Sequence, residues 1–304
     1  MMSSCSDKTK NQYEVYVAKY MQYCSENDIV WYRPRINDVL EFIVLMYDSG
    51  VGYSSLNSCR SALSLILRPI DGFVIGEHPL VRRIIKGVFR SRPPQPRYAY
   101  TWDVTKLLKN LASLGDNYVM SMLNLSMKLI CLLALSTAQR VQTLHSITVN
   151  NISYDSDSLY IKITSLVKTS RPGVCQPLLR LNPFVSDKNL CPVSALKAYL
   201  CRTLEFRSSH QLFLGVQKPH APVTVQTLSR WLKLGLMKAG IDTSIFTAHS
   251  FRGASTSRAL RQGVPIDVIF RQAGWRTTST FGRFYNREVQ PHESLFEEVV
   301  LSNK

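Results

Sequence analysis

Acidic side chains are scarce in this sequence of 304 residues: 21 Asp and Glu stand against 37 Lys and Arg, which gives a formal net charge of +16. A charge this far from zero indicates an anionic partner, with polyanions such as nucleic acid ahead of an anionic membrane. The few acids are scattered along the chain. Metal-dependent nucleases and transposases need a carboxylate cluster, so the sequence disfavours that class.

Paired cysteines and long apolar runs are also missing. The seven cysteines form no CxxC pair and no Cys/His cluster with zinc spacing, so we expect reduced thiols in an intracellular protein. The N-terminal stretch MMSSCSDKTKNQYEVY has no apolar signal core, and runs such as LICLLALS are too short to span a bilayer. These absences predict a soluble protein that is neither secreted nor in a membrane.

What the sequence does contain is material for two globular domains, because 45% of its residues are apolar and only 19% are charged. Apolar residues recur with helical spacing in INDVLEFIVLMYDSG, and SSLNSCRSALSLILR and HPLVRRIIKGVFRS open with residues that favour helix starts. Residues 8–92 are therefore predicted to form a bundle of four or more helices. The prolines of residues 93–100 indicate a stiff linker.

The remaining residues, 101–304, mix the two periodicities. TWDVTKLLKNLASLG and VMSMLNLSMKLICLLALSTAQR have helical patterns, and the second is apolar on nearly all sides, which predicts a buried helix. Residues 146–181 alternate like strands between turns. Helical patterns return at 192–206, 224–239, 247–262, 265–273 and around 278–287. The predicted fold class is mainly α with a small antiparallel β-sheet, in two domains.

A purely basic pair stands out in FTAHSFRGASTSRAL, where His249 and Arg252 lie three residues apart at a predicted helix start. Residues 249–287 hold seven Arg, no Lys and one acid, Asp267. Side chains at positions i and i+3 share a helix face, so both can reach one phosphate near the helix N-terminus. Attack on a phosphodiester builds negative charge on the non-bridging oxygens, and prearranged cations stabilise that charge.

The same residues belong to a longer pattern that resembles the tyrosine recombinase, or phage integrase, family. AHSFRGAS is followed by Trp275 in QAGWRTTST and by Tyr285 in FGRFYNR, and the spacing of the three is the specific part. LSTAQRVQTLHSI looks like the family's earlier arginine box, which assigns Arg140. VKTSRPG lies in the turn that carries the family's lysine, which assigns Lys168. Stretches such as YSSLNSCRSALS and RPPQPRYAYTWDV look most like the recombinases of eukaryotic Crypton and DIRS-like mobile elements.

The resemblance implies a domain plan and a reaction. Residues 8–92 would be a helical DNA core-binding (SAM-like) domain, 93–100 the linker and 101–304 the catalytic domain. Tyr285 would be the nucleophile that forms a 3′-phosphotyrosine link to DNA, in a site-specific recombinase from a mobile element. The link conserves the energy of the broken bond, so we expect no cofactor and no metal. Double-stranded DNA is the expected partner, bound by a homo-tetramer on paired sites.

Each catalytic residue has an expected role in that scheme. The assignments follow the family's motifs and are carried over position by position. Arg140 and Arg252 would bind the non-bridging oxygens, His249 would assist proton transfer, Lys168 would protonate the leaving 5′-oxygen, and Trp275 would donate its indole N–H to a phosphate oxygen. In the first domain, DNA contacts are expected from Arg60, Lys86 and Arg90.

Taken singly, these residues also have structural interpretations. A tyrosine late in the chain is more often a packing residue, a histidine before a helix often caps it, and a lysine in a turn is often solvated. Arg140 follows an apolar helix and would suit the negative end of that helix. The chain also departs from the family, with Thr143 where many members carry an acid, and with one extra residue between Trp275 and Tyr285.

Three functions stay open at this point. The first is an active recombinase, the second a domesticated homologue that binds DNA without cutting it, and the third a relaxing enzyme like type IB topoisomerases that works as a monomer. A nuclear location is expected if the host is eukaryotic, and a cytoplasmic or nucleoid location otherwise. The apolar residues of the C-terminal segment EVQPHESLFEEVVLSNK would dock on a neighbouring subunit or pack on their own.

Overall fold

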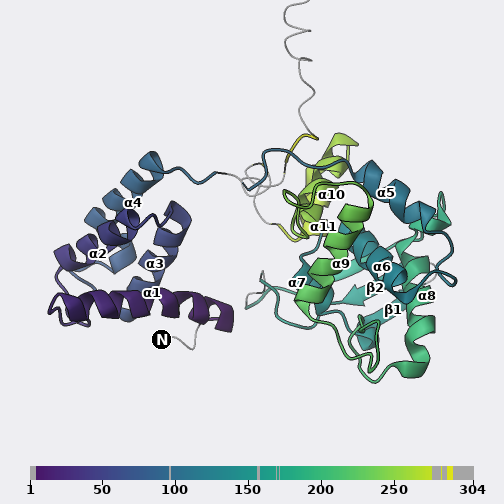
Figure 1. Cartoon of the computed structure of the whole chain (residues 1–304), viewed down its shortest axis with the longest axis horizontal. Coiled ribbons are helices and arrows are strands. Elements are labelled where there is room, and N and C mark those ends of the chain that lie inside the picture. Colours follow the sequence, from purple (N-terminus) through teal and green to yellow (C-terminus); the bar gives the residue numbers. More distant parts are fainter. Residues whose placement is uncertain are drawn as a thin grey trace, which may run out of the picture. The chain divides into compact units, whose positions relative to one another are not determined.

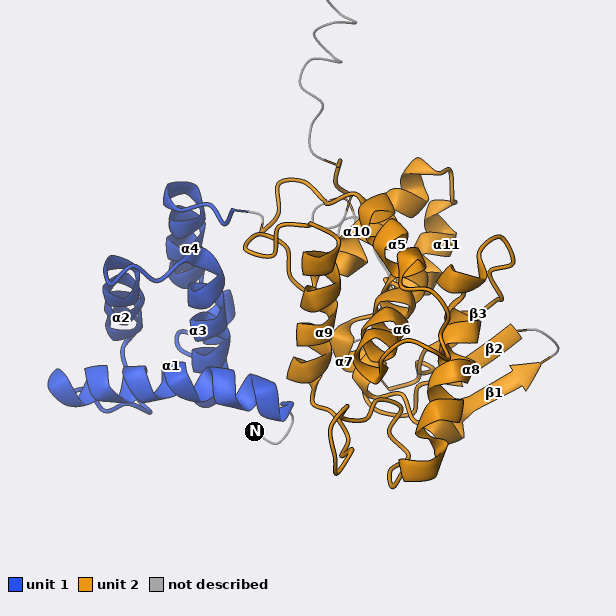
Figure 2. Ribbon diagram, turned by 45° about the vertical axis from the view of Figure 1, so that its right-hand side comes forward, with its two compact units in different colours: residues 1–96 blue, residues 97–304 orange. Residues whose placement is uncertain are grey.

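The chain divides into two compact units, residues 1–96 and residues 97–304 (Figure 2). The computed structural model describes residues 5–95, 97–155, 158–168, 170, 172–275, 282 and 286–289. The division falls inside the proline-rich segment, where proline removes backbone donors and limits regular structure. Each unit encloses a hydrophobic core of its own.

Unit 1 is a bundle of helices around an apolar core. Pro79 stands at the first position of its helix, where a missing N–H costs nothing. Tyr20 and Phe42 meet edge to face in the core, with ring centroids 5.2 Å apart. The α-helices described in this unit are α1 (Asp7–Glu26), α2 (Ile36–Asp48), α3 (Tyr53–Ile66) and α4 (Pro79–Ser91).

Unit 2 is built around one buried helix, α6 (Met122–Thr137), which packs against helices on several sides (Figure 1). Its residues from Leu125 to Ala134 are all buried, as the apolar sequence predicts. The other α-helices described in this unit are α5 (Val104–Ser113), α7 (Val141–His145), α8 (Pro192–Thr203), α9 (Val225–Lys238), α10 (Ser250–Arg261) and α11 (Ile266–Ala273).

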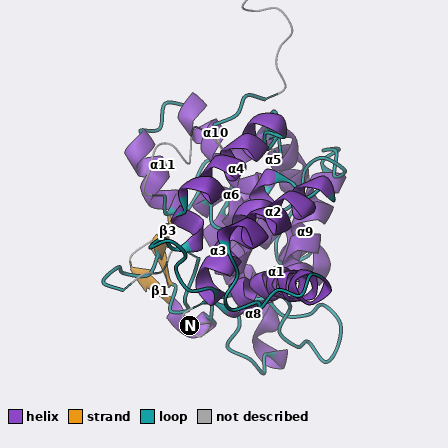
Figure 3. Cartoon of the chain, turned by 90° about the vertical axis from the view of Figure 1, so that its left-hand side faces the viewer, coloured by secondary structure: helices purple, strands orange, loops and turns teal. Residues whose placement is uncertain are grey.

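The strands of unit 2 form a small antiparallel sheet of order β1-β2-β3. They are shorter than the alternating stretches in the sequence, because Thr148 leads into a 3₁₀ turn and Pro177 cannot donate to the ladder. Figure 3 shows helices in most of the described chain and strands in this sheet alone. The mainly α fold class with a small antiparallel sheet is therefore confirmed. The strands are β1 (Ile152–Asp155), β2 (Ser158–Lys162) and β3 (Leu178–Leu181).

Two helices differ in length from the sequence-based expectation. Helix α6 ends at Thr137, because Ala138 adopts the left-handed conformation with φ of 51°. Helix α10 begins at Ser250, after a turn in which the Ser250 N–H donates to the Thr247 carbonyl. The helix expected around 278–287 lies almost entirely outside the described residues. Both observed ends place residues of the basic cluster at helix termini.

Close packing of α6 on α9 depends on a glycine. A Cβ atom added at Gly235 would lie 2.6 Å from Cys131 Sγ, inside van der Waals contact. Glycine otherwise weakens a helix by about 1 kcal/mol relative to alanine. The absence of a side chain at this position is therefore required by the approach of the two helices.

We expect Gly235→Ala to lower the free energy of unfolding by about 1–3 kcal/mol, the usual effect of overpacking. Urea denaturation followed by tryptophan fluorescence would measure it, since three of the four tryptophans lie in unit 2. Combination with Cys131→Ala should restore part of the loss. Gly87→Ala is the control, because no atom lies within 4 Å of its added Cβ; a Gly235→Ala variant as stable as this control would contradict the packing argument.

Candidate active site

The junction between α6 and α7 carries the first arginine of the pattern. Ala138 turns the chain through a left-handed conformation that costs a non-glycine residue about 1–2 kcal/mol, and Arg140 then caps the start of α7. Arg140 is half-buried, and its side chain has no hydrogen bond or ion pair with a described residue. Thr143, one turn into α7, is buried. The turn leaves the Arg140 side chain available to a ligand.

Arg252 on α10 is almost completely enclosed, with only 2% of its surface exposed. Its Nη1 donates to the Ala138 carbonyl at 3.0 Å and its Nη2 donates to the Ala273 carbonyl at 2.6 Å. These carbonyls lie at the C-terminal ends of α6 and α11, where the helix dipoles favour a positive charge. The interaction with the end of the apolar helix, considered for Arg140, is therefore made by Arg252.

Trp275 completes the enclosure of Arg252. Helix α11 ends at Gly274, whose φ of 66° suits glycine, and the Trp275 N–H donates back to the Phe270 carbonyl at 2.9 Å. The Cζ atom of Arg252 lies 4.6 Å from the centre of the Trp275 ring, which is a cation–π geometry. The structure thus brings two predicted site residues into contact. Trp275 is buried and stacks against the guanidinium.

A reciprocal pair of amide side chains holds the same two helix ends together. Gln139 Nε2 donates to the Gln272 carbonyl at 2.8 Å, and Gln272 Nε2 donates to the Ser136 carbonyl at 2.9 Å. With the two bonds from Arg252, the end of α6 and the end of α11 are joined by four hydrogen bonds. This rigid base fixes where the Arg252 guanidinium lies.

His249 occupies the position before α10 and meets the predicted cations. Its pKa is lowered from the ordinary value of 6.5, first by loss of hydration and then by the positive charges of Arg252, Arg140, Arg97 and Lys168. The residue nevertheless keeps an exposed surface, so solvent still screens those charges. These cations therefore lie near enough to His249 to disfavour its protonated ring, in addition to the effect of its lost hydration.

Lys168 lies in the segment between β2 and β3, as the pattern requires. The Ser170 N–H donates to the Val167 carbonyl at 2.8 Å, and the Val167 N–H donates to Ser170 Oγ at 2.8 Å, so a tight turn carries the lysine. Its side chain is exposed, yet its charge acts on His249. The turn thus presents Lys168 toward the site from the sheet.

Tyr285 lies outside the described residues. The short stretch that follows it is described and is attached to α10. The Arg287 N–H donates to Ser257 Oγ at 3.0 Å, and Arg261 Nη1 donates to the Arg287 carbonyl at 2.8 Å. The Thr101 N–H donates to the Glu288 carbonyl at 2.7 Å. Two residues after the predicted nucleophile, the chain is therefore held on the helix that carries Arg252.

The predicted DNA contacts of unit 1 lie on two of its helices. Lys86 and Arg90 are exposed on α4 and four residues apart, so they share the face opposite the buried residues of that helix. Arg82 is exposed one turn earlier on the same face. Arg60 lies on α3 and is half-buried. Lys86 and Arg90 thus form part of one basic face, whereas Arg60 belongs to another helix.

Arg97 was missed by the sequence-based selection. It follows the linker prolines in RPPQPRYAY, where nothing in the spacing relates it to residue 249. The fold brings it to His249 from a position more than 150 residues earlier in the chain. Arg97 could have been predicted only by knowing how the first residues of unit 2 pack against the loop before α10.

The cluster is suited to an anion. Arg97, Arg140, Lys168 and Arg287 form no ion pair with any residue that the structure describes. Within the described ranges, no three His, Cys, Asp or Glu side chains are arranged to hold a metal ion, and no helix is long and apolar enough to cross a membrane. Cations without protein counter-ions can stabilise the charge that develops on a phosphate oxygen.

Comparison with protein families and structures agrees with this geometry. Residues 100–291 match the Phage integrase family. The XerH site-specific recombinase bound to palindromic difH substrate in a post-cleavage complex has a similar fold, with a TM-score of 0.64 at 16% identity over 96% of this chain and 78% of that chain. Comparison with curated protein sequences found no significant match.

Two further solved structures share the fold. The Tn1549 transposon integrase in complex with transposon right end DNA has a TM-score of 0.62 at 14% identity, over 92% of this chain and 90% of that chain. A lambda integrase dimer bound to a COC′ core site has a TM-score of 0.58 at 16% identity, over 95% of this chain and 75% of that chain. The two-domain tyrosine recombinase architecture is therefore confirmed.

We expect Arg252→Ala and Arg140→Ala to differ in stability. Loss of two buried, charge-assisted hydrogen bonds at Arg252 should lower the free energy of unfolding by roughly 3 kcal/mol. Loss of the half-buried Arg140 side chain should change it by less than about 0.5 kcal/mol. Urea denaturation of both variants would test this contrast, and equal losses would show that the carbonyl contacts of Arg252 contribute nothing.

The neighbouring cations should also be visible in the titration of His249. We expect NMR of the free protein to give a midpoint below 6.5, because loss of hydration and then the positive neighbours disfavour the protonated ring. Arg97→Ala should raise that midpoint, since one of those charges is gone. A His249→Gln variant identifies the signal among the six histidines. A midpoint at or above 6.5 in the unaltered protein would contradict the cationic site.

Proposed function

The chain belongs to the phage integrase family, and we propose that it is a site-specific recombinase that cuts and rejoins duplex DNA through Tyr285. The observation that carries this proposal is the cationic cluster around His249, in which Arg140, Lys168 and Arg252 act on one ring. A pure DNA-binding protein has no need for this arrangement together with the nucleophile that the sequence predicts. We propose that a scissile phosphate binds at this cluster and supplies the negative charge that balances its cations.

The proposed reaction is a transesterification at phosphorus. The Tyr285 oxygen attacks the phosphorus and loses its proton, the bond from phosphorus to the 5′-oxygen breaks, and the product is a 3′-phosphotyrosine link with a free 5′-hydroxyl. Lys168 gives a proton to the leaving oxygen. Attack of another 5′-hydroxyl on the link reverses these steps, so the bond energy is conserved and no external energy source is consumed.

The described contacts support the roles that we propose for the other residues. Arg140 is positioned to bind a non-bridging oxygen, because its side chain is half-buried without a described partner. Arg252 supplies positive charge from a fixed, enclosed position against Trp275. Loss of hydration and then the cationic neighbours lower the pKa of His249, so its neutral ring can accept the proton of Tyr285 as well as hydrogen-bond the phosphate.

DNA on paired sites is the proposed substrate, bound by a homo-tetramer. The neighbouring structures include a lambda integrase tetramer bound to a Holliday junction and the Tn1549 transposon integrase with transposon DNA. The excess charge of +16 suits a large phosphate surface. We further propose an origin in a mobile element of the Crypton or DIRS-like kind, supported by the stretches around residues 53–64 and 92–104, and hence a nuclear location in a eukaryotic host.

A suicide duplex tests the reaction. With nicked duplexes of candidate element ends, the protein should form a covalent protein–DNA adduct that survives a denaturing gel. Tyr285→Phe lacks the nucleophilic oxygen and should form none, while the exposed Tyr118→Phe should form as much as the unaltered protein. Binding of the ends without any adduct would favour the domesticated DNA-binding homologue instead.

The relaxing enzyme makes a different prediction on the same proteins. A type IB topoisomerase-like activity would relax a supercoiled plasmid that lacks the element ends, because it needs no paired sites. We expect no such relaxation above the level of Tyr285→Phe. Relaxation that depends on Tyr285 and is independent of the ends would replace the recombinase proposal with this alternative.

A further inference from the structure

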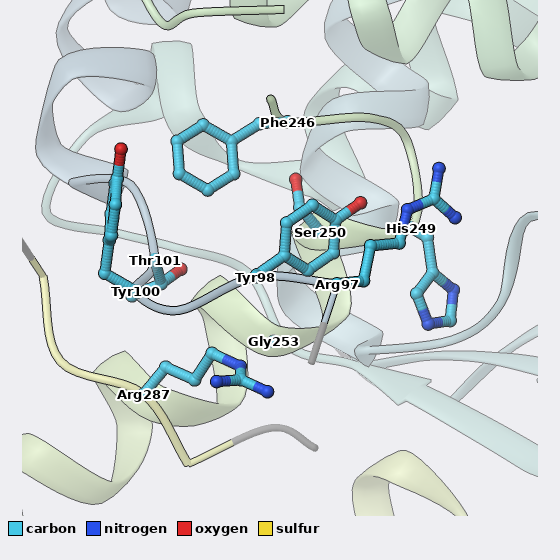
Figure 4. Close-up of a pocket in the computed structure, with 9 residues that line it drawn as sticks. All are labelled: Arg97, Tyr98, Tyr100, Thr101, Phe246, His249, Ser250, Gly253 and Arg287. Atoms are coloured by element: carbon cyan, nitrogen blue, oxygen red, sulfur yellow. The ribbon is translucent and has the colours of Figure 1, made fainter. Parts of the chain in front are cut away.

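A cavity of about 210 Å³ adjoins the candidate active site on the side of His249. Three of its lining side chains are basic, namely Arg97, His249 and Arg287, and the aromatic rings of unit 2 that line it are Tyr98, Tyr100 and Phe246. Figure 4 shows Arg97 beside His249 and Arg287 on the other side of the cavity. The cavity therefore combines positive charge with an apolar wall.

The chain around Arg97 is fixed to the loop that carries His249. Tyr98 stacks on Phe246, with ring centroids 5.8 Å apart, and its hydroxyl makes a hydrogen bond of 2.8 Å with Thr247 Oγ1. Trp102 Nε1 donates to Ser250 Oγ at 2.8 Å. Residues on both sides of His249 are thus tied to the segment that begins at Arg97. This explains why the Arg97 charge acts on the histidine.

Arg287 is fixed from the opposite side. Its backbone is held by Ser257 and Arg261 on α10, and its Nη1 reaches the Ala99 carbonyl at 3.5 Å. Its Nε is buried and has no hydrogen-bond partner among the described residues. Arg287 has no described ion pair either, and neither does Arg97, which is exposed. Two guanidinium groups without counter-ions therefore share one cavity.

We propose that this cavity is a second phosphate site, in which Arg97 and Arg287 bind the DNA backbone phosphate next to the scissile one. The proposal rests on the proposed function, since it takes the cluster around His249 as the place of the scissile phosphate. His249 belongs to the cluster that would bind the scissile phosphate and also lines the cavity. The adjacent phosphate of the same DNA strand is therefore the anion that we expect in the cavity. Forked guanidinium donors suit phosphate oxygens, and the aromatic wall suits the apolar face of the sugar.

Charge removal on the DNA tests the contact directly. A neutral methylphosphonate replaces one phosphate at a time on either side of the cleavage position of the suicide duplex, and single-turnover cleavage is measured. At one neighbouring position we expect the unaltered protein to slow about tenfold, the size of one charge-assisted contact. Arg97→Ala should be slower on unmodified DNA and should lose less rate at that position than the unaltered protein does, because only Arg287 then binds the phosphate. Arg97→Lys should keep part of the rate.

Arg230→Ala is the matched control, because Arg230 is an exposed arginine of unit 2 outside the cavity. It should respond to the methylphosphonate as the unaltered protein does. The proposal would be overturned if every methylphosphonate slowed cleavage by the same factor in Arg97→Ala as in the unaltered protein. A second result would also overturn the proposal: the effect of Arg97→Ala depends on an abasic substitution in the DNA and on no methylphosphonate. The cavity would then hold a nucleobase.

Failure of the proposed function would look different. In that case the unaltered protein forms no adduct on unmodified DNA. The unaltered protein and Arg97→Ala are then compared by equilibrium binding, with the unmodified and methylphosphonate forms of the duplex that binds most tightly. About tenfold weaker binding at one methylphosphonate, with a smaller loss in Arg97→Ala, would support the phosphate site without cleavage. No such coupling would overturn it.

Discussion

The guanidinium of Arg252 joins the ends of two helices, and the geometry of the site depends on that junction. It donates to one carbonyl at the end of α6 and another at the end of α11 while it stacks on Trp275. A buried charge needs such partners, because desolvation without them costs several kcal/mol. The helix ends satisfy the cation without a carboxylate in these contacts, so its charge is not cancelled by an acid there.

The surrounding residues extend the same electrostatic principle. Arg252, Arg140 and Lys168 come from a helix, a helix cap and a turn between strands, yet their charges all act on the His249 ring. A site built in this way has a high positive potential in the free protein, and an anionic ligand relieves it. In the proposed reaction, binding of DNA and stabilisation of a phosphorus-centred transition state would therefore use the same residues.

The start of unit 2 and the described stretch 286–289 meet beside this cluster. The segment from Arg97 to Trp102 lies against the loop before α10, and the stretch after Tyr285 is bonded to α10 and to Thr101. The linker from unit 1 therefore leads directly into residues that contact the chain next to the predicted nucleophile. This arrangement connects residues 287 and 288 to the start of unit 2 through a few backbone and side-chain hydrogen bonds.

Local sequence patterns predicted the fold class, the buried helix α6 and the pair formed by His249 and Arg252. Hydrophobic periodicity identifies helices and strands, and a spacing of three residues places two side chains on one helix face. The basic pair in FTAHSFRGASTSRAL identified His249 and Arg252, and the resemblance to the recombinase motifs added Arg140 and Lys168; the fold gathers all four. Two features came from long-range packing. Arg97 comes near His249 only because segments that are distant in the sequence pack together. The sequence suggested that Arg140 would interact with the C-terminal end of α6, but Arg252 makes that hydrogen bond, because the tertiary structure determines which guanidinium faces the helix end.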